Sequence, residues 1–422
     1  MPITWTYENF NTFDPNENSR LLKKLESALP EFVNKSNDPN QPVLSLPSTD
    51  EDLAEIQSHS DRIASNCKEV LVIGVGGSSL GSQALIQACN KVIENRPKIH
   101  FADNLCPTNF PQLLASLDPK HTHILAISKS GNTLEVLVQL SIILEWLDKS
   151  KCKYNEHLTA ITGNQKSPLS ELITKHNIPW LEHINLLGGR FSILSNVGML
   201  PAAIAGIKVD EVRGGAQDVI NSMKNASNSA KVQSAIGAAH LVSQLYKKSI
   251  NVSVLFLYSE KLRKFGEWYC QLWAESLGKN GVGTTPIVAN GPLDQHSQLQ
   301  LYMEGPRDKS YSFITVGSDA DTKVTIPNKI DMLKNVGISG LTMNDIVNAM
   351  SEGTLHAISE TGQPVRHLHI KKLDERTIGQ LFMHFFLETK FASALLNVNP
   401  YGQPGVERGK VITREFLKKM NN

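Results

Sequence analysis

The sequence predicts an α/β protein with two doubly wound lobes, each built on a parallel sheet. From residue 69 onward, short apolar runs rich in β-branched residues alternate with stretches of helical periodicity. This alternation is typical of strands joined by crossover helices. A chain of 422 residues is long enough for two or three domains. Its 41% hydrophobic and 20% charged residues are the composition of a globular protein.

The N-terminal segment, residues 1–65, is polar and carries Pro39, Pro42 and Pro47. It contains one modest amphipathic stretch, Arg20–Phe32. We expect this segment to wrap around the lobes that follow.

The first lobe, residues 66–213, contains four apolar runs that predict strands and two amphipathic stretches that predict helices. The predicted strands are Val70–Val75, Ile99–Ala102, His123–Ile127 and Leu158–Ile161, and the predicted helices are Leu85–Glu94 and Leu134–Leu147.

The second lobe, residues 214–396, begins at a Gly-rich turn near Gly214 and repeats the alternation of helix and strand. The expected elements are a helix at Ser234–Lys247, strands at Val252–Tyr258 and Tyr311–Val316, and a long helix at Glu375–Leu396. Residues 397–422 form a C-terminal arm, in which the sequence VNPYGQPG breaks the long helix and a last helix starts near Pro404.

The charge balance argues against a polyanionic partner. Lys and Arg number 42 against 41 Asp and Glu, so the net charge is +1, and neither nucleic-acid binding nor attraction to an anionic membrane is expected. No window approaches the ~18 apolar residues of a membrane helix. The best one, Leu137–Leu147, is interrupted by Gln139 and Glu145.

The chain is expected to be cytoplasmic. Its N-terminus has no positive charge before Arg20 and no apolar run, so it does not read as a secretory signal. The five cysteines are odd in number and lack the close spacing of a zinc or redox motif, which suits a reducing compartment.

The first predicted strand leads directly into a Gly/Ser turn, GVGGSSLGSQAL at Gly74–Leu85. Backbone N–H groups in such a turn, at the start of a helix, favour an anion. Dinucleotide binding is one interpretation, with Asp103 near the place of the ribose-binding acid. However, the fingerprint G-x-G-x-x-G fails at its third glycine, where the chain has Ser79. A turn that serves only packing is the other alternative.

A second turn of similar chemistry, ILAISKSGNTLEVL at Ile124–Leu137, follows another apolar strand. Clustered hydroxyls and N–H donors suit a phosphate monoester, whose terminal oxygens accept many hydrogen bonds. Alone, the turn could be a surface helix cap. Two such turns at strand ends of one sheet favour a sugar phosphate over a nucleotide. The polar residues of the second turn are Ser128, Lys129, Ser130, Asn132 and Thr133.

A candidate general base lies on the helix predicted at Lys261–Lys279, which Gly278 ends. Gln271 and Glu275 are four residues apart and share one face, close to Trp268. A carboxylate among apolar and aromatic side chains suits proton abstraction. Most glutamates near a helix end are simply solvated or act as caps, so position alone does not make Glu275 catalytic.

Three further residues could take part in chemistry. His296 follows Asp294, a plausible helix cap, and would lie in a first helical turn, where the helix dipole favours the neutral imidazole. Arg190 follows two glycines and could instead make a structural ion pair. Lys410 would lie two turns into the last helix and could simply be exposed.

Neither a metal site nor a serine hydrolase is indicated. The chain has no H-E-x-x-H motif and no close Cys pair, and His367 and His369 lie in a run that reads as a strand. No G-x-S-x-G follows a strand. We expect no metal and no cofactor.

These pieces together resemble the phosphoglucose isomerase family in its shorter bacterial form, from about Val70 to Lys410. Six motifs occur in family order, and together they are far more specific than any one alone. They are GVGGSSLG (Gly74–Gly81), ISKSGNT (Ile127–Thr133), GGRFS (Gly188–Ser192), AESLGK (Ala274–Lys279), DQHSQLQLYMEGP (Asp294–Pro306) and NPYGQPGVERGK (Asn399–Lys410).

The resemblance implies two flavodoxin-like sugar-isomerase domains and an intimate homodimer. The implied reaction interconverts glucose 6-phosphate and fructose 6-phosphate through an enediolate, in glycolysis and gluconeogenesis, without a cofactor. Glu275 would shuttle the proton between C2 and C1, and Arg190 would stabilise the enediolate. His296, supplied across the dimer interface, would open the sugar ring with help from Lys410. The residues implied to bind substrate are Gly77, Ser78, Ser128, Lys129, Ser130, Thr133, Gln271 and Gln403.

Two positions depart from the family pattern beside the implied substrate site: Leu277 stands where many members have Asn, and Gly131-Asn132 stands where longer members have Phe-Thr. The alternatives are an isomerase of mannose or amino-sugar phosphates, a non-catalytic sugar-phosphate regulator, and a nicotinamide dehydrogenase. A pure binder would need none of the acid/base set formed by Glu275, His296, Arg190 and Lys410.

Overall fold

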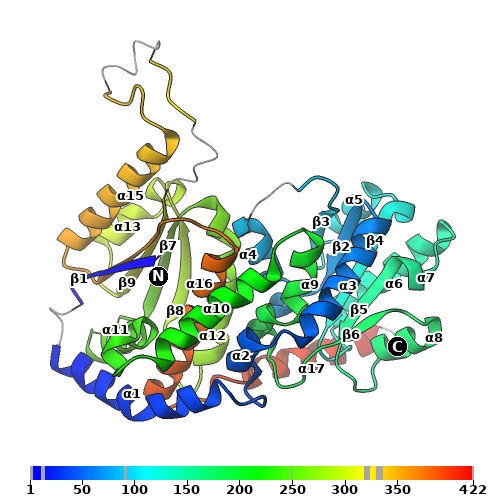
Figure 1. Ribbon diagram of the computed structural model, residues 1–422, viewed down its shortest axis with the longest axis horizontal. Coiled ribbons are helices and arrows are strands. Elements are labelled where there is room, and N and C mark those ends of the chain that lie inside the picture. The colour runs from blue at the N-terminus through cyan, green and yellow to red at the C-terminus, as the bar shows by residue number, and fades with distance from the viewer. Residues whose placement is uncertain are drawn as a thin grey trace.

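The computed structural model describes residues 3–10, 15–89, 93–248, 250–317, 324–328 and 336–420. It contains two five-stranded sheets with helices packed on their faces (Figure 1). The first sheet has the order β3-β2-β4-β5-β6, and all its pairings are parallel. Its strands are β2 (Glu69–Ile73), β3 (Lys98–Ala102), β4 (Thr122–Ser128), β5 (Leu158–Thr162) and β6 (Trp180–Glu182).

The second sheet has the order β1-β10-β9-β7-β8 and is parallel except at one edge. There β1 runs antiparallel to β10, with Ile3 opposite Ile370 and Glu8 opposite Val365. The N-terminal segment, expected only to wrap around the lobes, thus also contributes a strand. The strands are β1 (Ile3–Glu8), β7 (Val252–Tyr258), β8 (Thr285–Asn290), β9 (Lys309–Val316) and β10 (Val365–Ile370).

Both sheets share one winding pattern. Numbered along the chain, the first has the flavodoxin-like order 2-1-3-4-5, and β7 to β10 of the second have the order 2-1-3-4, with β1 in the fifth place. In such sheets, ligands bind beyond the carboxyl ends of the strands where the winding reverses. In the first sheet this point lies between β2 and β4, the strands that lead into the two Gly/Ser turns.

A shared core joins the two sheets. Helix α16 (Glu375–Leu396) is buried along nearly its whole length, and it packs against α10 (Val209–Lys224), α11 (Gln233–Lys248) and α12 (Arg263–Leu277). One hydrophobic cluster runs from Val72 of β2 through Phe382 of α16 to Leu257 of β7. The helices are α1 (Pro15–Lys35), α2 (Pro42–Ser45), α3 (Glu51–Asn66), α4 (Leu80–Cys89), α5 (Asn109–Ala115), α6 (Leu134–Lys149), α7 (Tyr154–His157), α8 (Pro168–His176), α9 (Asn196–Ile204), α10 (Val209–Lys224), α11 (Gln233–Lys248), α12 (Arg263–Leu277), α13 (Leu299–Glu304), α15 (Met343–Glu360), α16 (Glu375–Leu396) and α17 (Glu407–Met420).

Most predicted elements are found within a few residues of their expected ends, and α16 matches the predicted range. The Gly-rich turn predicted near Gly214 is wrong, because Gly214 lies inside α10 (Val209–Lys224), and a Cβ atom on the adjacent Gly215 would lie 1.8 Å from the carbonyl oxygen of Arg376 in α16. Helix α4 begins at Leu80, five residues before the predicted Leu85. The helix starts directly after the first Gly/Ser turn, because Ser79 ends the preceding 3-10 turn Gly76–Ser78. The predicted end at Glu94 lies beyond residues 90–92, which are outside the described ranges.

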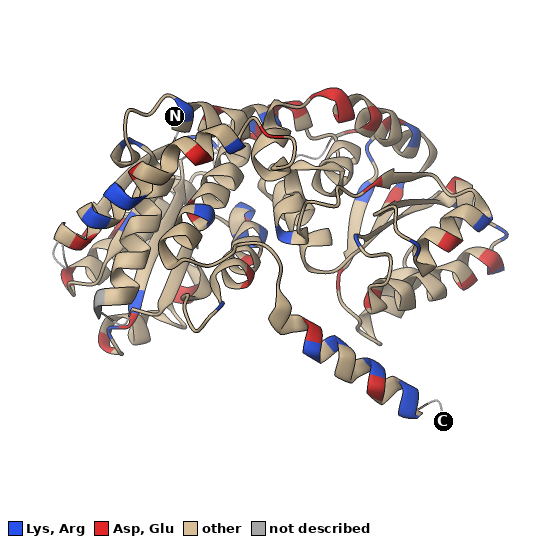
Figure 2. Cartoon of the chain, turned by 90° about the horizontal axis from the view of Figure 1, so that it is seen from below, with Lys and Arg blue, Asp and Glu red and all other residues tan. Residues whose placement is uncertain are grey.

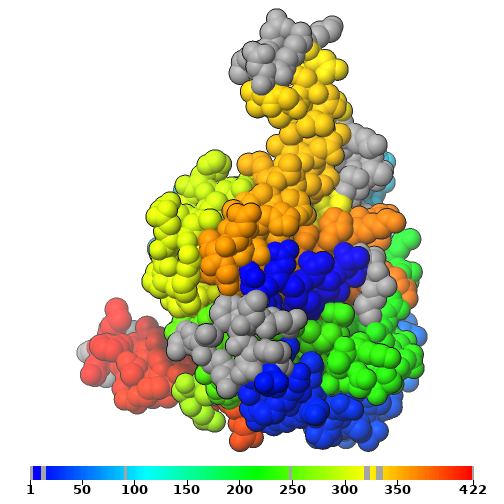
Figure 3. Space-filling view, turned by 90° about the vertical axis from the view of Figure 1, so that its left-hand side faces the viewer, coloured from blue at the N-terminus to red at the C-terminus, as the bar shows by residue number. Residues whose placement is uncertain are grey.

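The C-terminal helix α17 stands away from the body of the chain (Figures 2 and 3). None of its residues is buried, and its exposed side chains include Phe416 and Met420. Within the described ranges, no helix has the length and apolar character needed to cross a membrane.

Candidate active site

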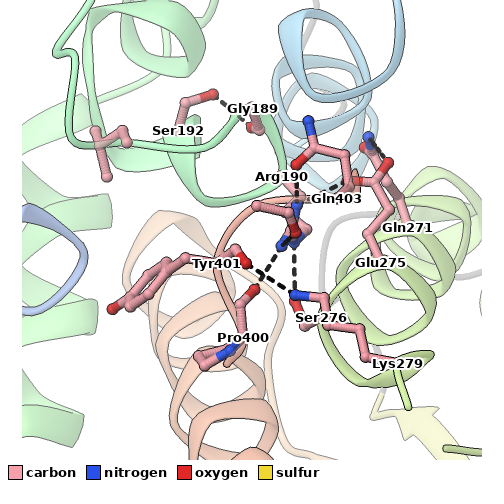
Figure 4. A network of polar contacts seen from close by, with 12 residues as sticks. Gly189, Arg190, Ser192, Gln271, Glu275, Ser276, Lys279, Pro400, Tyr401 and Gln403 are labelled. Carbon is pink, nitrogen blue, oxygen red and sulfur yellow. Dashed lines mark hydrogen bonds and ion pairs between the residues drawn. The ribbon is translucent and has the colours of Figure 1, made fainter. Parts of the chain in front are cut away.

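The centre of the site is an ion pair between Arg190 and Glu275 (Figure 4). Arg190 lies in the 3-10 turn Gly189–Leu194, and Glu275 lies in the last turn of α12. The distance from Arg190 Nη1 to Glu275 Oε2 is 2.8 Å. The Arg190 side chain is 1% exposed and that of Glu275 29%, so the carboxylate is the accessible partner.

Two glutamines flank this ion pair, as Figure 4 shows. Gln271 Nε2 donates to Glu275 Oε1 at 2.9 Å, which is the one-face relationship that the spacing of four predicts. Arg190 Nη1 also donates to Gln403 Oε1 at 3.2 Å. Glu275 therefore has each oxygen engaged by a different donor, which fixes the plane of the carboxylate.

Arg190 and Lys279 hold the loop that carries Gln403 through its backbone carbonyls. Arg190 Nη2 donates to the carbonyls of Pro400 and Gly402, the second at 3.1 Å. Lys279 Nζ donates to the carbonyl oxygens of Asn399 and Tyr401, the second at 2.9 Å. Two cations thus hold four successive carbonyls of the Asn399–Gln403 loop.

The electrostatics of the site reflect this burial. Burial lowers the pKa of the Arg190 guanidinium, and the charge and hydrogen bond of Glu275 oppose that shift. Burial also lowers the pKa of the Lys279 ammonium, Arg190 lowers it further and Glu275 raises it. The two cations repel each other, and the negative charge of Glu275 reduces the cost of placing them close together.

The first Gly/Ser turn packs directly against the backbone that precedes Arg190. A Cβ atom on Gly77 would lie 2.0 Å from the carbonyl carbon of Gly189, so only glycine fits. Ser192 Oγ donates to the carbonyl of Gly189 at 2.7 Å and lies 3.3 Å from that of Gly77. Ser78 ends the turn and is half-buried. The structure therefore brings the first turn and the ion pair together.

The polar side chains of the second turn form hydrogen bonds with other groups of the protein. Ser128 is buried, and its hydroxyl lies 2.8 Å from that of Thr133. Lys129 Nζ donates to the carbonyls of Asn185 at 2.7 Å and Leu187 at 2.8 Å, and burial lowers its pKa. Ser130 is exposed, and its Oγ accepts the N–H of Asn132 at 3.2 Å. Ser130 is the most accessible hydroxyl of the turn, whereas Lys129 links the turn to the segment before Arg190.

The departures from the family pattern have structural counterparts. Gly131 has a φ of +63°, and a Cβ atom there would lie 2.1 Å from Ser167 Oγ, so the turn requires glycine. Leu277 is 1% exposed and belongs to the shared core. An apolar residue at position 277 is thus explained by packing.

His296 is not in a helical first turn as predicted. His296 directly follows the 3-10 turn Leu293–Gln295, and α13 begins only at Leu299. The expected cap, Asp294, instead accepts the N–H of Asn290 at 2.6 Å and the Ser297 hydroxyl at 2.7 Å, which folds the loop back onto the end of β8.

His296 and Lys410 form no hydrogen bond with the Arg190–Glu275 ion pair in the described ranges. Both side chains are exposed, and Lys410 Nζ pairs with Glu407 Oε1 at 2.8 Å on α17. Across the described part of the chain, no hydrogen bond or ion pair connects either residue to Arg190 or Glu275.

The groups near the ion pair do not favour a dinucleotide. Asp103 Oδ2 accepts from Gln83 Nε2 at 2.6 Å, and the same amide nitrogen lies 2.6 Å from Ser79 Oγ. Asp103, the residue that would bind the ribose of a dinucleotide, is therefore already hydrogen-bonded to Gln83 of α4. The arrangement offers an accessible carboxylate, a buried cation beside it and a Gly/Ser turn packed next to them, which suits proton transfer next to a carbonyl.

Comparison with known proteins agrees with this chemistry. Residues 51–422 match the family model described as phosphoglucose isomerase. The chain belongs to the phosphoglucose isomerase family.

Curated relatives of this phosphoglucose isomerase family member extend over nearly its whole length. The glucose-6-phosphate isomerase of Rubrobacter xylanophilus is 33% identical over 423 residues, 97% of each chain. That of Thermus thermophilus is 33% identical and covers 96% of this chain and 97% of its own.

Solved structures show the same fold. A hypothetical protein of Thermus thermophilus aligns with a TM-score of 0.88 and 32% identity, covering 98% of this chain and all of its own. A glucose-6-phosphate isomerase of Chlamydia trachomatis has a TM-score of 0.77 at 19% identity, over 88% of this chain and 74% of its own. This second likeness concerns the fold alone.

Sequence reasoning about this member of the phosphoglucose isomerase family missed Lys279 and Tyr401 as parts of the site. Both lie within motifs that were singled out, AESLGK and NPYGQPG. Lys279 follows Gly278, which ends α12 after Leu277, so its spacing of four from Glu275 does not place the two residues on one helix face. Nothing local predicts that its ammonium meets a loop 120 residues away.

Proposed function

We propose that this chain is a glucose-6-phosphate isomerase, which interconverts glucose 6-phosphate and fructose 6-phosphate. The observation that carries the proposal is the Arg190–Glu275 ion pair, held beside the first Gly/Ser turn in a chain of this family. Moving a carbonyl between C1 and C2 needs one base that takes and returns a proton, and a cation near the oxygen that gains charge.

In the aldose-to-ketose direction, Glu275 takes the proton from C2 of the open-chain sugar. The electron pair of that C–H bond forms the C1=C2 double bond, and the C1 oxygen takes the negative charge. Glu275 then returns its proton to C1, while the C2 hydroxyl loses its proton and becomes the carbonyl. The proton lost from the C2 oxygen is gained by the C1 oxygen. Arg190 stabilises the enediolate between the two proton transfers.

The remaining predicted residues have supporting roles in this scheme. The substrate phosphate binds at the two Gly/Ser turns, through Gly77, Ser78, Ser130 and the backbone around Thr133. Ser128 and Lys129 stabilise the second turn through their hydrogen bonds with Thr133 and with the backbone of Asn185. Gln271 and Gln403 border the reacting carbons.

Ring opening is assigned to His296 with Lys410, and His296 comes from a second copy of the chain. This assignment fits the exposure of His296 and of the whole of α17. The active form is thus a homodimer. The reaction is placed in the cytoplasm, and it uses neither a cofactor nor a nucleic-acid partner.

A coupled assay tests the proposed reaction. The purified chain is supplied with fructose 6-phosphate, and the glucose 6-phosphate formed is read through a dehydrogenase under metal chelation, beside the Glu275→Gln variant. Turnover by the wild type and near-background turnover by the variant support the reaction and the base. If the folded wild type is inactive in this assay but converts mannose or amino-sugar phosphates, the protein is an isomerase of that other sugar phosphate. If it converts none of them, the protein is a non-catalytic sugar-phosphate-binding regulator.

A further inference from the structure

Lys390 is a buried cation that the proposed mechanism does not use. It lies on α16, is 4% exposed and directs its Nζ to the hydroxyl of Tyr401 at 2.5 Å. The same Nζ lies 5.0 Å from the centroid of the Tyr401 ring. A buried ammonium is costly unless it is well partnered, and here the described side-chain partner is the hydroxyl of one tyrosine.

Tyr401 connects this lysine to the site. Its hydroxyl also donates to Gln41 Oε1 at 3.3 Å, and its ring packs 5.6 Å from that of Phe191, the residue after Arg190. Its backbone N–H donates to Asn399 Oδ1 at 2.9 Å, and its carbonyl accepts from Lys279. Tyr401 therefore lies at the middle of the Asn399–Gln403 loop and is held on both its side chain and its backbone.

The same loop determines where Arg190 and Gln403 lie. Arg190 donates to the carbonyls on either side of Tyr401, those of Pro400 and Gly402, and also to the side chain of Gln403. A shift of the loop would move these acceptors and would turn the guanidinium away from Glu275. The position of the proposed enediolate-stabilising cation therefore depends on how firmly Tyr401 is held.

We propose that Lys390 is a positioning residue, which acts through the hydroxyl of Tyr401 to fix the Asn399–Gln403 loop and thereby to aim Arg190 at the reacting carbons. This inference rests on the proposed isomerase reaction.

The protonation states support the direction of the hydrogen bond. Burial, and to a smaller extent the charge of Lys35, lower the pKa of Lys390 to about 8, with Glu31 opposing this shift. Burial raises the pKa of Tyr401, with Arg190 opposing. At neutral pH the ammonium therefore donates to a neutral phenol. The charged and titratable groups around Lys390 are Glu31 and Lys35 of α1 and Tyr401 itself.

The test compares Lys390→Met, Tyr401→Phe and the double variant with the wild type. Each single variant removes the same hydrogen bond and keeps an apolar body in place. We expect kcat to fall about tenfold in each, as for a small misplacement of a catalytic group, with KM nearly unchanged. Because both residues act through one contact, the double variant should be no slower than the singles. Additive losses, or a rise in KM alone, would overturn the proposal.

Lys24→Met is the matched control. Lys24 donates to the carbonyl of Leu395 on the same helix, at 3.2 Å, and does not engage Tyr401. It should leave kcat unchanged, so an equal loss there would assign the effect to α16 in general.

Amide hydrogen exchange gives a readout that is independent of activity. Lys390→Met should speed exchange in the peptide that contains residues 399–403, and Lys24→Met should not. A wild type without turnover would overturn the proposed function, whereas unchanged exchange in Lys390→Met would overturn the positioning role by itself.

Discussion

Arg190 and Glu275 form a 2.8 Å ion pair in which the arginine is buried and the carboxylate remains partly accessible. The pair joins the turn before α9 to the end of α12, 85 residues further along the chain. Its asymmetry leaves the base reachable by substrate, while the cation is held from behind by Ser276, whose Oγ lies 2.8 Å from Arg190 Nε.

Glu275→Gln should lower kcat by about 10²–10⁴-fold, because the amide cannot accept the proton while its shape and its hydrogen bond with Gln271 can persist. Ser130→Ala should chiefly raise KM, since its exposed hydroxyl would bind the phosphate in ground and transition states alike. Steady-state kinetics with fructose 6-phosphate measures both. If Ser130→Ala costs as much kcat as Glu275→Gln at constant KM, this division of roles is wrong.

Arg190→Lys should lower kcat by about 10²–10³-fold, the typical effect of losing a donor to a developing oxyanion. A lysine cannot reach Glu275, Gln403 and the loop carbonyls at once, because it lacks the forked guanidinium. The control is Arg376→Lys, an exposed arginine paired with Asp218 and Glu211. Comparable losses in both variants would show that the effect is not specific to the site.

Glu388→Gln should destabilise the fold by about 3–5 kcal/mol, because it leaves the buried Arg366 without its counter-charge. Both side chains are 0% exposed and are joined by two hydrogen bonds of 2.6 and 2.9 Å. Burial alone would raise the pKa of Glu388, but Arg366 and His384 lower it to about 2. Urea unfolding measures the change. Glu145→Gln, which breaks an exposed pair with Lys149, should cost at most about 1 kcal/mol.

Stability should fall as the pH is lowered from about 6.5 to 4, with His240 contributing. Burial, and to a smaller extent the charge of Arg366, lower the pKa of His240 to about 4, with Glu388 opposing this shift. The unfolded chain binds a proton below about 6.5, whereas the folded chain does not until about 4, so acid favours unfolding. At pH 5 this imidazole accounts for roughly 2 kcal/mol of the loss. Urea midpoints at pH 7 and 5 should differ less in His240→Gln than in the wild type, and an equal difference would contradict the assignment.

Phe416→Asp should convert the proposed homodimer into a monomer, because it places a charge on an exposed apolar side chain of α17. Light scattering measures the mass, and Lys418→Glu on the same helix is the control for charge. The monomer should also lose activity, since His296 is assigned to the second copy. A monomeric variant with full kcat would contradict that assignment.

The sequence by itself determined the local units. Apolar runs followed by Gly/Ser turns predicted β2 and β4 with their helices, and the spacing of Gln271 and Glu275 predicted their contact, because periodicity and an i,i+4 relationship act within one element. The six motifs in order also indicated the family, which the comparisons confirm.

Only the tertiary structure decided which distant groups meet. The contacts of Arg190 with Glu275 and with the loop after α16, and the antiparallel pairing of β1 with β10, join segments far apart in the chain. The position of His296 likewise depends on a tertiary contact, because Asp294 accepts the N–H of Asn290 and does not cap a helix. Such contacts depend on how the shared core brings the two sheets together, and no local pattern of residues encodes that packing.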